Sequence, residues 1–308
     1  MAAAGQVAKQ KRSTQSFVGV MASVWKRPSL VALEVAWRWI AGGPIMLVVY
    51  LFGKQHSDVL AEVWAQWGTM TFFHPAEMAS TLGATSARLF DLAQPVLAKF
   101  ITVSMLWWCA VGAIGQVLFA KRLLGAASKT RLALVFCLRL MRSLGVLLCW
   151  ALWASVVLAV AHHELTTKAT LGAEPDVLVF LAVSIVFSLA LFVGWATLSW
   201  PLSLALAWNA QHGTSLGGSL RASVTSKLAR SEVLEISLVM CIVKIALVVL
   251  AMTFSACPLP FATIATQEFL QNWWIAMAVL YMLASDYFHS VRFAAYVQVC
   301  EAALDETA

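Results

Sequence analysis

Long apolar runs alternate with short polar segments along most of this chain. Six of the runs are long enough to cross the roughly 30 Å hydrocarbon core of a bilayer, which takes about 20 helical residues. The six runs cover residues 29–52, 96–119, 143–161, 177–200, 233–256 and 272–294. The pattern therefore predicts an all-α integral membrane protein with six transmembrane helices.

The amino-acid composition supports the same class. Of 308 residues, 61% are hydrophobic and only 12% are charged, against roughly 25% charged residues in an ordinary soluble domain. A soluble fold could not bury so many apolar side chains and keep a wettable surface. The 14 tryptophans point the same way, because indole rings favour the boundary between membrane and water.

Basic residues orient the predicted spans, because they gather on the cytoplasmic side of membrane proteins. Arg38 and Lys244 lie within spans, and the other basic residues divide unevenly between the two sides. The side of the N-terminus holds fifteen: Lys9, Lys11, Arg12, Lys26, Arg27, Lys121, Arg122, Lys129, Arg131, Arg139, Arg142, Arg221, Lys227, Arg230 and Arg292. The opposite side holds four: Lys54, Arg88, Lys99 and Lys168. We therefore expect a multi-pass protein of the plasma membrane (the inner membrane, if bacterial) with both termini cytoplasmic.

This orientation also accounts for the net charge of +6. The longest basic run is the short "KQKR" at 9–12, and nucleic-acid binding would need an extended basic face. We therefore expect the lipid bilayer, and no nucleic acid, as the partner of the basic residues.

Residues 1–28 are expected to form a cytoplasmic segment that contains a short interfacial helix. One face of this helix, spaced at i, i+3, i+4 and i+7, is apolar. It consists of Phe17, Val20, Met21 and Val24. The six-span membrane domain follows over 29–300, and 301–308 form a short cytoplasmic tail.

Two longer connections have helical patterns of their own. In the external connection 54–95 we expect two or three short helices, with Pro75 and Thr85 as helix starts. The cytoplasmic connection 211–231 is expected to lie against anionic lipid headgroups. Its apolar stripe consists of Leu216, Leu220, Val224 and Leu228.

Two of the apolar runs extend beyond a single crossing. Arg131, Arg139 and Arg142 indicate that the first part of the third helix lies outside the bilayer. The fourth run continues to Ala210, and Pro201 predicts a kink near the interface.

Five ionisable residues fall inside the predicted spans, where each costs a few kcal/mol unless it is compensated. They are Glu34 and Arg38 in the first span, Lys244 in the fifth, and Asp286 and His289 in the sixth. At 1.5 Å per residue, Glu34 lies roughly 8 Å from the cytoplasmic edge, Arg38 roughly 14 Å and Lys244 roughly 17 Å. Asp286 lies roughly 9–12 Å from the same edge, with His289 shallower. All five therefore belong to the inner half of the bilayer.

Their spacing allows several pairings. Glu34 and Arg38 are related by i, i+4 and can meet on their own helix, and Asp286 shares a face with His289 at i, i+3. Lys244 has no acidic neighbour in its span, so Asp286 is its first expected partner and Glu34 its second. The cluster is either an ion-pair network that fixes helix packing, or a proton, ion or polar-substrate pathway.

Signatures of cofactors and catalysis are sparse. Asp286-x-x-His289 has the spacing found in di-iron bundles, but those need the motif twice and further carboxylates. We interpret "HHE" at 162–164 as a solvated helix end rather than a ligand set. The zincin H-E-x-x-H and the phosphate-binding G-x-x-x-x-G-K-[ST] motifs are absent. The six cysteines form no C-x-x-C pair and read as small buried hydrophobic residues, so we expect neither metal nor cofactor.

The sequence favours a non-enzymatic polytopic membrane protein that serves as an accessory or structural component, as a homo-oligomer or within a larger membrane complex. Two alternatives stay open. One is a small transporter or ion-coupled carrier that uses the intramembrane charges. The other is a lipid-modifying membrane enzyme.

Overall fold

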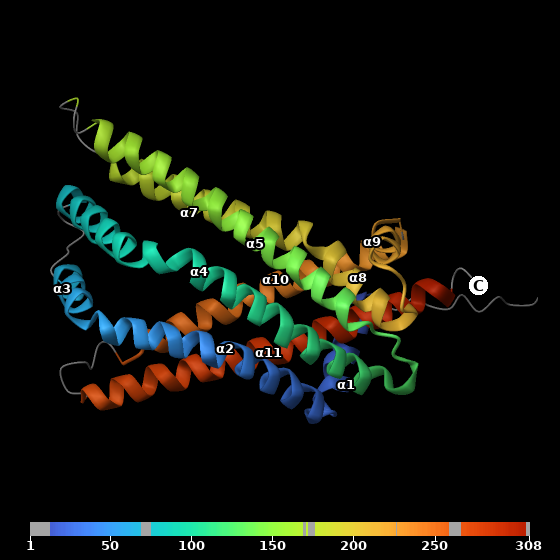
Figure 1. Ribbon diagram of the computed structural model, residues 1–308. Coiled ribbons are helices and arrows are strands. Elements are labelled where there is room, and N and C mark those ends of the chain that lie inside the picture. The colour runs from blue at the N-terminus through green and yellow to red at the C-terminus, as the bar shows by residue number, and fades with distance from the viewer. Residues whose placement is uncertain are drawn as a thin grey trace, which may run out of the picture. The chain divides into compact units, whose positions relative to one another are not determined.

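The computed structural model describes residues 13–68, 75–168, 171, 176–225, 227–258 and 266–305. Nearly all of these residues are helical and none is in a β-strand (Figure 1), which confirms the all-α class. The elements are α1 (Ser13–Trp25), α2 (Pro28–Gln55), α3 (Ser57–Gly68), α4 (Pro75–Leu124), η1 (Gly125–Ala127), α5 (Leu132–Ala161), η2 (His162–Thr167), α7 (Val177–Leu198), α8 (Trp200–His212), α9 (Leu216–Thr225), α10 (Lys227–Ala256) and α11 (Gln267–Asp305).

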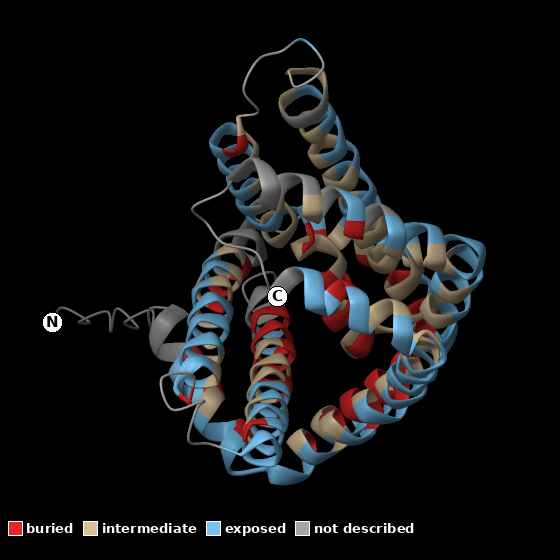
Figure 2. Cartoon of the chain, turned by 90° about the vertical axis from the view of Figure 1, so that its left-hand side faces the viewer, coloured by how far each residue is buried: buried red, intermediate tan, exposed pale blue. Residues whose placement is uncertain are grey.

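Five helical stretches are long and apolar enough to cross a membrane. They are Pro28–Gln55, Arg88–Ala127, Leu132–Glu164, Val177–His212 and Val233–Ala256, and they contain the first five predicted spans. Pale blue, the colour of exposed residues, covers long parts of these helices in Figure 2, and many of the exposed side chains are large and apolar. Such surfaces are the ones that lipid covers. The sixth predicted span lies in α11, which is not among the five.

The chain divides into two compact units, and each has its own contacts. The first consists of Met1–Ala36, Gly115–Leu138 and Ala196–Ala308. The second consists of Trp37–Ile114 and Arg139–Trp195. The division cuts through α2, α4, α5 and α7, so each of these helices belongs to both units.

Helix α8 is the most buried element of the first unit. It starts directly after a turn at Ser199, with Pro201 in its first turn, where a missing N–H costs no helical hydrogen bond. The predicted break near Pro201 is therefore confirmed. At the other end Gly213 has φ 64° and donates its N–H to the Asn209 carbonyl, 2.9 Å away. Between these two ends α8 packs on α9, α10 and α11, with Leu204 and Ala207 fully buried.

The apolar face of α1 is buried by protein. Phe17, Val20 and Val24 are 7%, 1% and 1% exposed, and α1 packs on α10 and α11. The segment forms a helix, as its spacing predicts. The face that we expected to meet lipid is instead occupied by these two helices.

Helix α9 packs on α8 and α10. Its fully buried side chains are Ser219 and Ser223. In the expected apolar stripe, Leu216 and Leu220 are only partly buried and Val224 is 55% exposed; the side chain of Leu228 lies outside the described set. The contact of this stripe with lipid headgroups stays a prediction.

The second unit contains the external connection 54–95. Helix α3 forms its first part, and α4 begins at Pro75 as expected. Thr85 does not start a helix, because α4 continues through it and its hydroxyl donates to the Thr81 carbonyl one turn earlier. An exposed ion pair between Glu62 and Arg88 joins α3 to α4.

Candidate functional site

Two of the five intramembrane charges meet in the first unit. Glu34 on α2 is buried, with a side chain only 4% exposed, and His289 on α11 is 22% exposed. The His289 Nδ1 atom lies 2.7 Å from Glu34 Oε1. Two lone pairs would repel at that distance, so a proton lies between the two groups, on Nδ1 or on the Glu34 carboxyl. The contact joins α2 to α11, and it is an ion pair when the imidazole is protonated.

The residues around His289 extend this junction. Asp286 is 5% exposed and Ser290 is fully buried, and the Ser290 hydroxyl donates to the Asp286 backbone carbonyl. Tyr287 donates its hydroxyl to the Met21 carbonyl of α1 at 3.2 Å, and its ring meets Trp25 edge-on. One and a half turns of α11 thus contact both α1 and α2.

Lys244 is placed differently from the other members of the cluster. It is exposed on α10, beside Ile242 and Ile245, which are 67% and 43% exposed. A lysine among exposed apolar residues can bury its aliphatic stem and extend its ammonium group toward the headgroups. Its pairing with Asp286 remains a prediction.

Arg38 belongs to a cation–aromatic cluster in the second unit. Its guanidinium carbon lies 5.4 Å from the centre of the Trp37 ring. The guanidinium carbon of Arg139, from α5, lies closer to the same ring, at 4.6 Å. Trp37 is 5% exposed and also contacts Trp108 of α4, with ring centres 5.9 Å apart. Such contacts gain strength when desolvated, up to about 2 kcal/mol or more.

Arg139 packs where helices α4 and α5 meet in the second unit. Its guanidinium lies directly against Gly112 in the apolar part of α4, in space that a Cβ atom on that glycine would occupy. Cys109 and Ser143 are also in contact, 3.4 Å apart. The candidate spanning stretch Leu132–Glu164 includes Arg139 but is longer than one crossing needs, so its expected position outside the bilayer stays a prediction. The sequence reasoning did not foresee the contact of Arg139 with α4.

The "HHE" segment forms η2, a turn of π-helix. His162 and His163 are exposed, His163 contacts Glu164 at 3.0 Å, and Glu164 pairs with Lys168. The hydrogen bond that Lys168 donates to the Glu164 carboxylate raises the pKa of Lys168. Among the described residues, no three His, Cys, Asp or Glu side chains come together as a metal site would require.

A short motif at 213–217 also escaped the sequence reasoning. It reads Gly-Thr-Ser-Leu-Gly, which matches the G-x-S-x-G pattern of a nucleophile elbow, where the serine lies between a strand and a helix. Here it connects α8 to α9, and the Ser215 hydroxyl accepts the Gly218 N–H at the start of α9. The serine therefore caps a helix, and the strand–turn–helix context of the hydrolase motif is not met.

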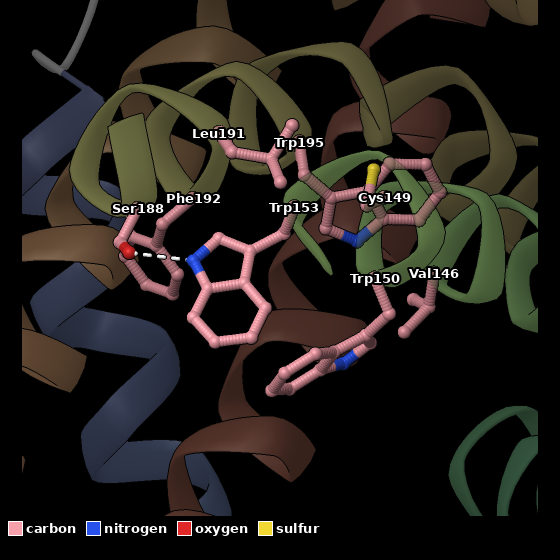
Figure 3. Close-up of a pocket in the computed structure, with 8 residues that line it drawn as sticks. All are labelled: Val146, Cys149, Trp150, Trp153, Ser188, Leu191, Phe192 and Trp195. Atoms are coloured by element: carbon pink, nitrogen blue, oxygen red, sulfur yellow. Dashed lines mark hydrogen bonds between the residues drawn. The ribbon is translucent and has the colours of Figure 1, made fainter. Parts of the chain in front are cut away.

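A pocket of about 320 Å³ lies between α5 and α7 (Figure 3). Its lining is mostly apolar, and Trp150, Trp153 and Trp195 surround it. The indole N–H of Trp153 donates to the Ser188 hydroxyl at 2.8 Å. This hydrogen bond joins α5 to α7 across the pocket.

Comparisons of the chain with protein-family models, with curated proteins and with solved structures gave no match. The contacts described above are thus the basis for a functional proposal. Their common property is that the contacts of Glu34, His289 and Arg38 join two helices or stack on a buried ring.

Proposed function

We propose that this protein is a non-enzymatic membrane protein with six spans, both termini in the cytoplasm, and an accessory or structural role in the plasma membrane. The sixth span is residues 272–294 of α11. The support for it comes from hydrogen bonds between α10 and α11. Trp273 and Trp274 donate to the carbonyls of Phe254 and Ser255, at 2.9 and 3.1 Å.

At the other end of the helix pair, the Ser237 and Tyr296 hydroxyls lie 3.0 Å apart. Ser237 and Phe254 are separated by about 26 Å along α10, close to the thickness of the hydrocarbon core. Helix α11 packs along this whole length. If α10 crosses the membrane, α11 must return beside it, which brings the C-terminus to the cytoplasmic side.

The observation that carries the structural role is the Glu34–His289 ion pair. It pairs a buried carboxylate in the first span with an imidazole in the last span. In addition, none of the residues in the most apolar 18-residue stretches of α5 and α7 is buried. Large surfaces of these helices are therefore available to lipid, to a second copy of the protein or to other membrane subunits.

A double-mutant cycle tests this role. Either Glu34→Gln or His289→Gln leaves one charged group buried beside a neutral partner, and we expect a loss of about 2–4 kcal/mol in the free energy of unfolding. The double variant should lose at least about 1 kcal/mol less than the sum of the single losses. The exposed pair Glu62 and Arg88 is a matched control, for which we expect coupling near zero.

Unfolding by sodium dodecyl sulfate in mixed micelles, followed by circular dichroism, measures these free energies. Strictly additive losses for Glu34→Gln and His289→Gln would contradict a structural role for the pair.

An ion-coupled carrier is the second candidate, because His289 is partly exposed beside a buried carboxylate and imidazole titrates near neutral pH. Proteoliposomes with an internal pH-sensitive dye measure its proton flux. The carrier predicts a flux that His289→Gln abolishes and Arg88→Gln leaves unchanged. Absence of flux above that of empty liposomes would reject it.

A further inference from the structure

A long apolar groove runs between α2 and α4 in the second unit, and we call it the outer groove. Its volume is about 720 Å³, which is within the range of sites for small organic ligands, about 300–1,000 Å³. Pro44, Val48 and Phe52 line it from α2, and Val96, Val103 and Trp107 line it from α4. Val48 and Val103 are 49% and 67% exposed, so the groove is open along its side.

The outer groove matches one leaflet of a bilayer in length. From Phe52 to Pro44, and likewise from Lys99 to Trp107, the helices rise about 12 Å. Half of the roughly 30 Å hydrocarbon core is about 15 Å. Because α2 and α4 run in opposite directions through the predicted membrane, Phe52 and Lys99 lie at the shallow end of the groove and Pro44 and Trp107 at the deep end.

The deep end is closed by a hydrogen bond. The indole N–H of Trp107 donates to the Ala41 carbonyl at 3.0 Å, three residues before Pro44. This contact joins α4 to α2 below the groove and removes the only indole donor in its lining. Apart from Ser104, the rest of the lining toward the deep end is apolar and suits hydrocarbon.

The shallow end carries the only charge in the lining. Lys99 is exposed and contributes to the groove wall, and it is one of only four basic residues that the sequence places on the outer side. Its ammonium group stands where the headgroup of a lipid would be, if an acyl chain lay in the groove below it. An ammonium group at this position attracts the phosphate of a lipid headgroup. In an anionic lipid, no positive group in the headgroup offsets this attraction.

We propose that the outer groove binds one acyl chain of an anionic phospholipid whose phosphate contacts Lys99. The outer-leaflet location rests on the proposed topology, whereas the binding itself does not depend on the structural role of the protein. An occupied groove would fill the gap between α2 and α4 and make the lipid part of the folded unit.

The test uses the full chain in phosphatidylcholine nanodiscs that contain a trace of phospholipid with a diazirine on its acyl chain. The probe is either phosphatidylglycerol or phosphatidylcholine, and mass spectrometry maps the cross-linked peptides. We expect the phosphatidylglycerol probe to label the groove segments of α2 and α4 about fivefold more than the phosphatidylcholine probe does, which corresponds to about 1 kcal/mol for one lysine. Excess unlabelled phosphatidylglycerol should remove this difference.

Matched variants separate the roles of charge and groove shape. Lys99→Gln should reduce labelling by phosphatidylglycerol to the level of phosphatidylcholine, whereas Lys99→Arg should retain it. Lys54→Gln changes another exposed lysine at the outer end of α2, outside the groove lining, and should have no effect. Val103→Trp should lower labelling by both probes, and size-exclusion profiles establish that each variant is folded.

Three results would overturn the proposal. Equal labelling by the two probes in the unaltered protein means ordinary lipid solvation. Labelling that is insensitive to Lys99→Gln means that another group attracts the lipid. Protein–protein cross-links from the groove segments in place of lipid labelling mean that a second copy occupies the groove. The unfolding experiment on Glu34 and His289 is independent of all three.

Discussion

The substitution Gly112→Ala tests whether the packing of α4 against Arg139 holds this charge inside the second unit. A Cβ atom at position 112 would overlap the Arg139 guanidinium, whose carbon lies 4.6 Å from the centre of the Trp37 ring. The guanidinium nitrogen Nη1 is buried. The guanidinium therefore has to leave its place over the indole, or α4 and α5 have to separate.

The magnitude follows from three opposing effects. Loss of a desolvated cation–π contact costs about 2 kcal/mol, and overpacking costs about 1–3 kcal/mol. Alanine gains up to about 1 kcal/mol over glycine in a helix interior. The expected net loss in the free energy of unfolding is therefore about 2–4 kcal/mol.

Gly42→Ala is the matched control, because Gly42 also lies inside an apolar helix but a Cβ atom there meets nothing within 4 Å. It should be neutral or stabilise by up to about 1 kcal/mol. Arg139→Met in the Gly112→Ala background should recover most of the loss by removing the crowded group. Detergent unfolding in mixed micelles measures all four proteins. If Gly112→Ala unfolds like Gly42→Ala, the Arg139 side chain moves away without cost, and its assignment as a charge packed against α4 fails.

Two further predictions concern the first unit. Gly213 and Gly125 both have φ near 60°, but only at Gly213 would a Cβ atom crowd Lys129, at 3.0–3.1 Å. Gly125→Ala should lower the free energy of unfolding by about 1–2 kcal/mol because of φ alone, and Gly213→Ala by about 1–3 kcal/mol more. Equal decreases in the melting temperature of the two variants would contradict this packing. Cys257 is exposed at the predicted outer end of α10, so an impermeant maleimide should label it in intact cells. Burial raises the pKa of Cys300 to about 12, so Cys300 should stay unlabelled at pH 7.5 even in lysed cells and react faster as pH rises. Labelling of Cys257 only after lysis would reject the proposed orientation.

Hydrophobic periodicity predicts most of the helices but not the partner of each face. Five apolar runs recur as helices long enough to span a membrane, because length and apolarity are properties of a single segment. In α1 and α9 the helices form where expected, yet α1 turns its apolar face to protein and α9 buries Ser219 and Ser223. Which surface a face meets depends on neighbours that are distant in sequence, and periodicity contains no information about them.

For the charged residues too, the sequence predicts which residues matter but not which partners they contact. The sequence predicts Glu34 and His289 to be intramembrane groups, but helical spacing relates them to Arg38 and Asp286 on their own helices and not to each other. Estimated depth is the better signal, since Glu34 and His289 both lie close to the cytoplasmic edge. The environment of Arg139 is harder to foresee, because its position beside Gly112 depends on how far α5 is displaced along α4.

Helix α11 explains why Asp286 and His289 interrupt an apolar run. In its first half Ile275 and Leu280 are 61% and 57% exposed, whereas beyond Asp286 the side chains of Val291 and Cys300 are fully buried. The two polar residues thus lie where the helix passes from a surface that suits lipid to one enclosed by protein. At this boundary a carboxylate and an imidazole can be desolvated by neighbouring helices and still be paired, as His289 is with Glu34. At this position the pair can join α2 to α11 while His289 stays partly exposed. Whether water reaches the His289 side chain therefore distinguishes the carrier function from the structural role.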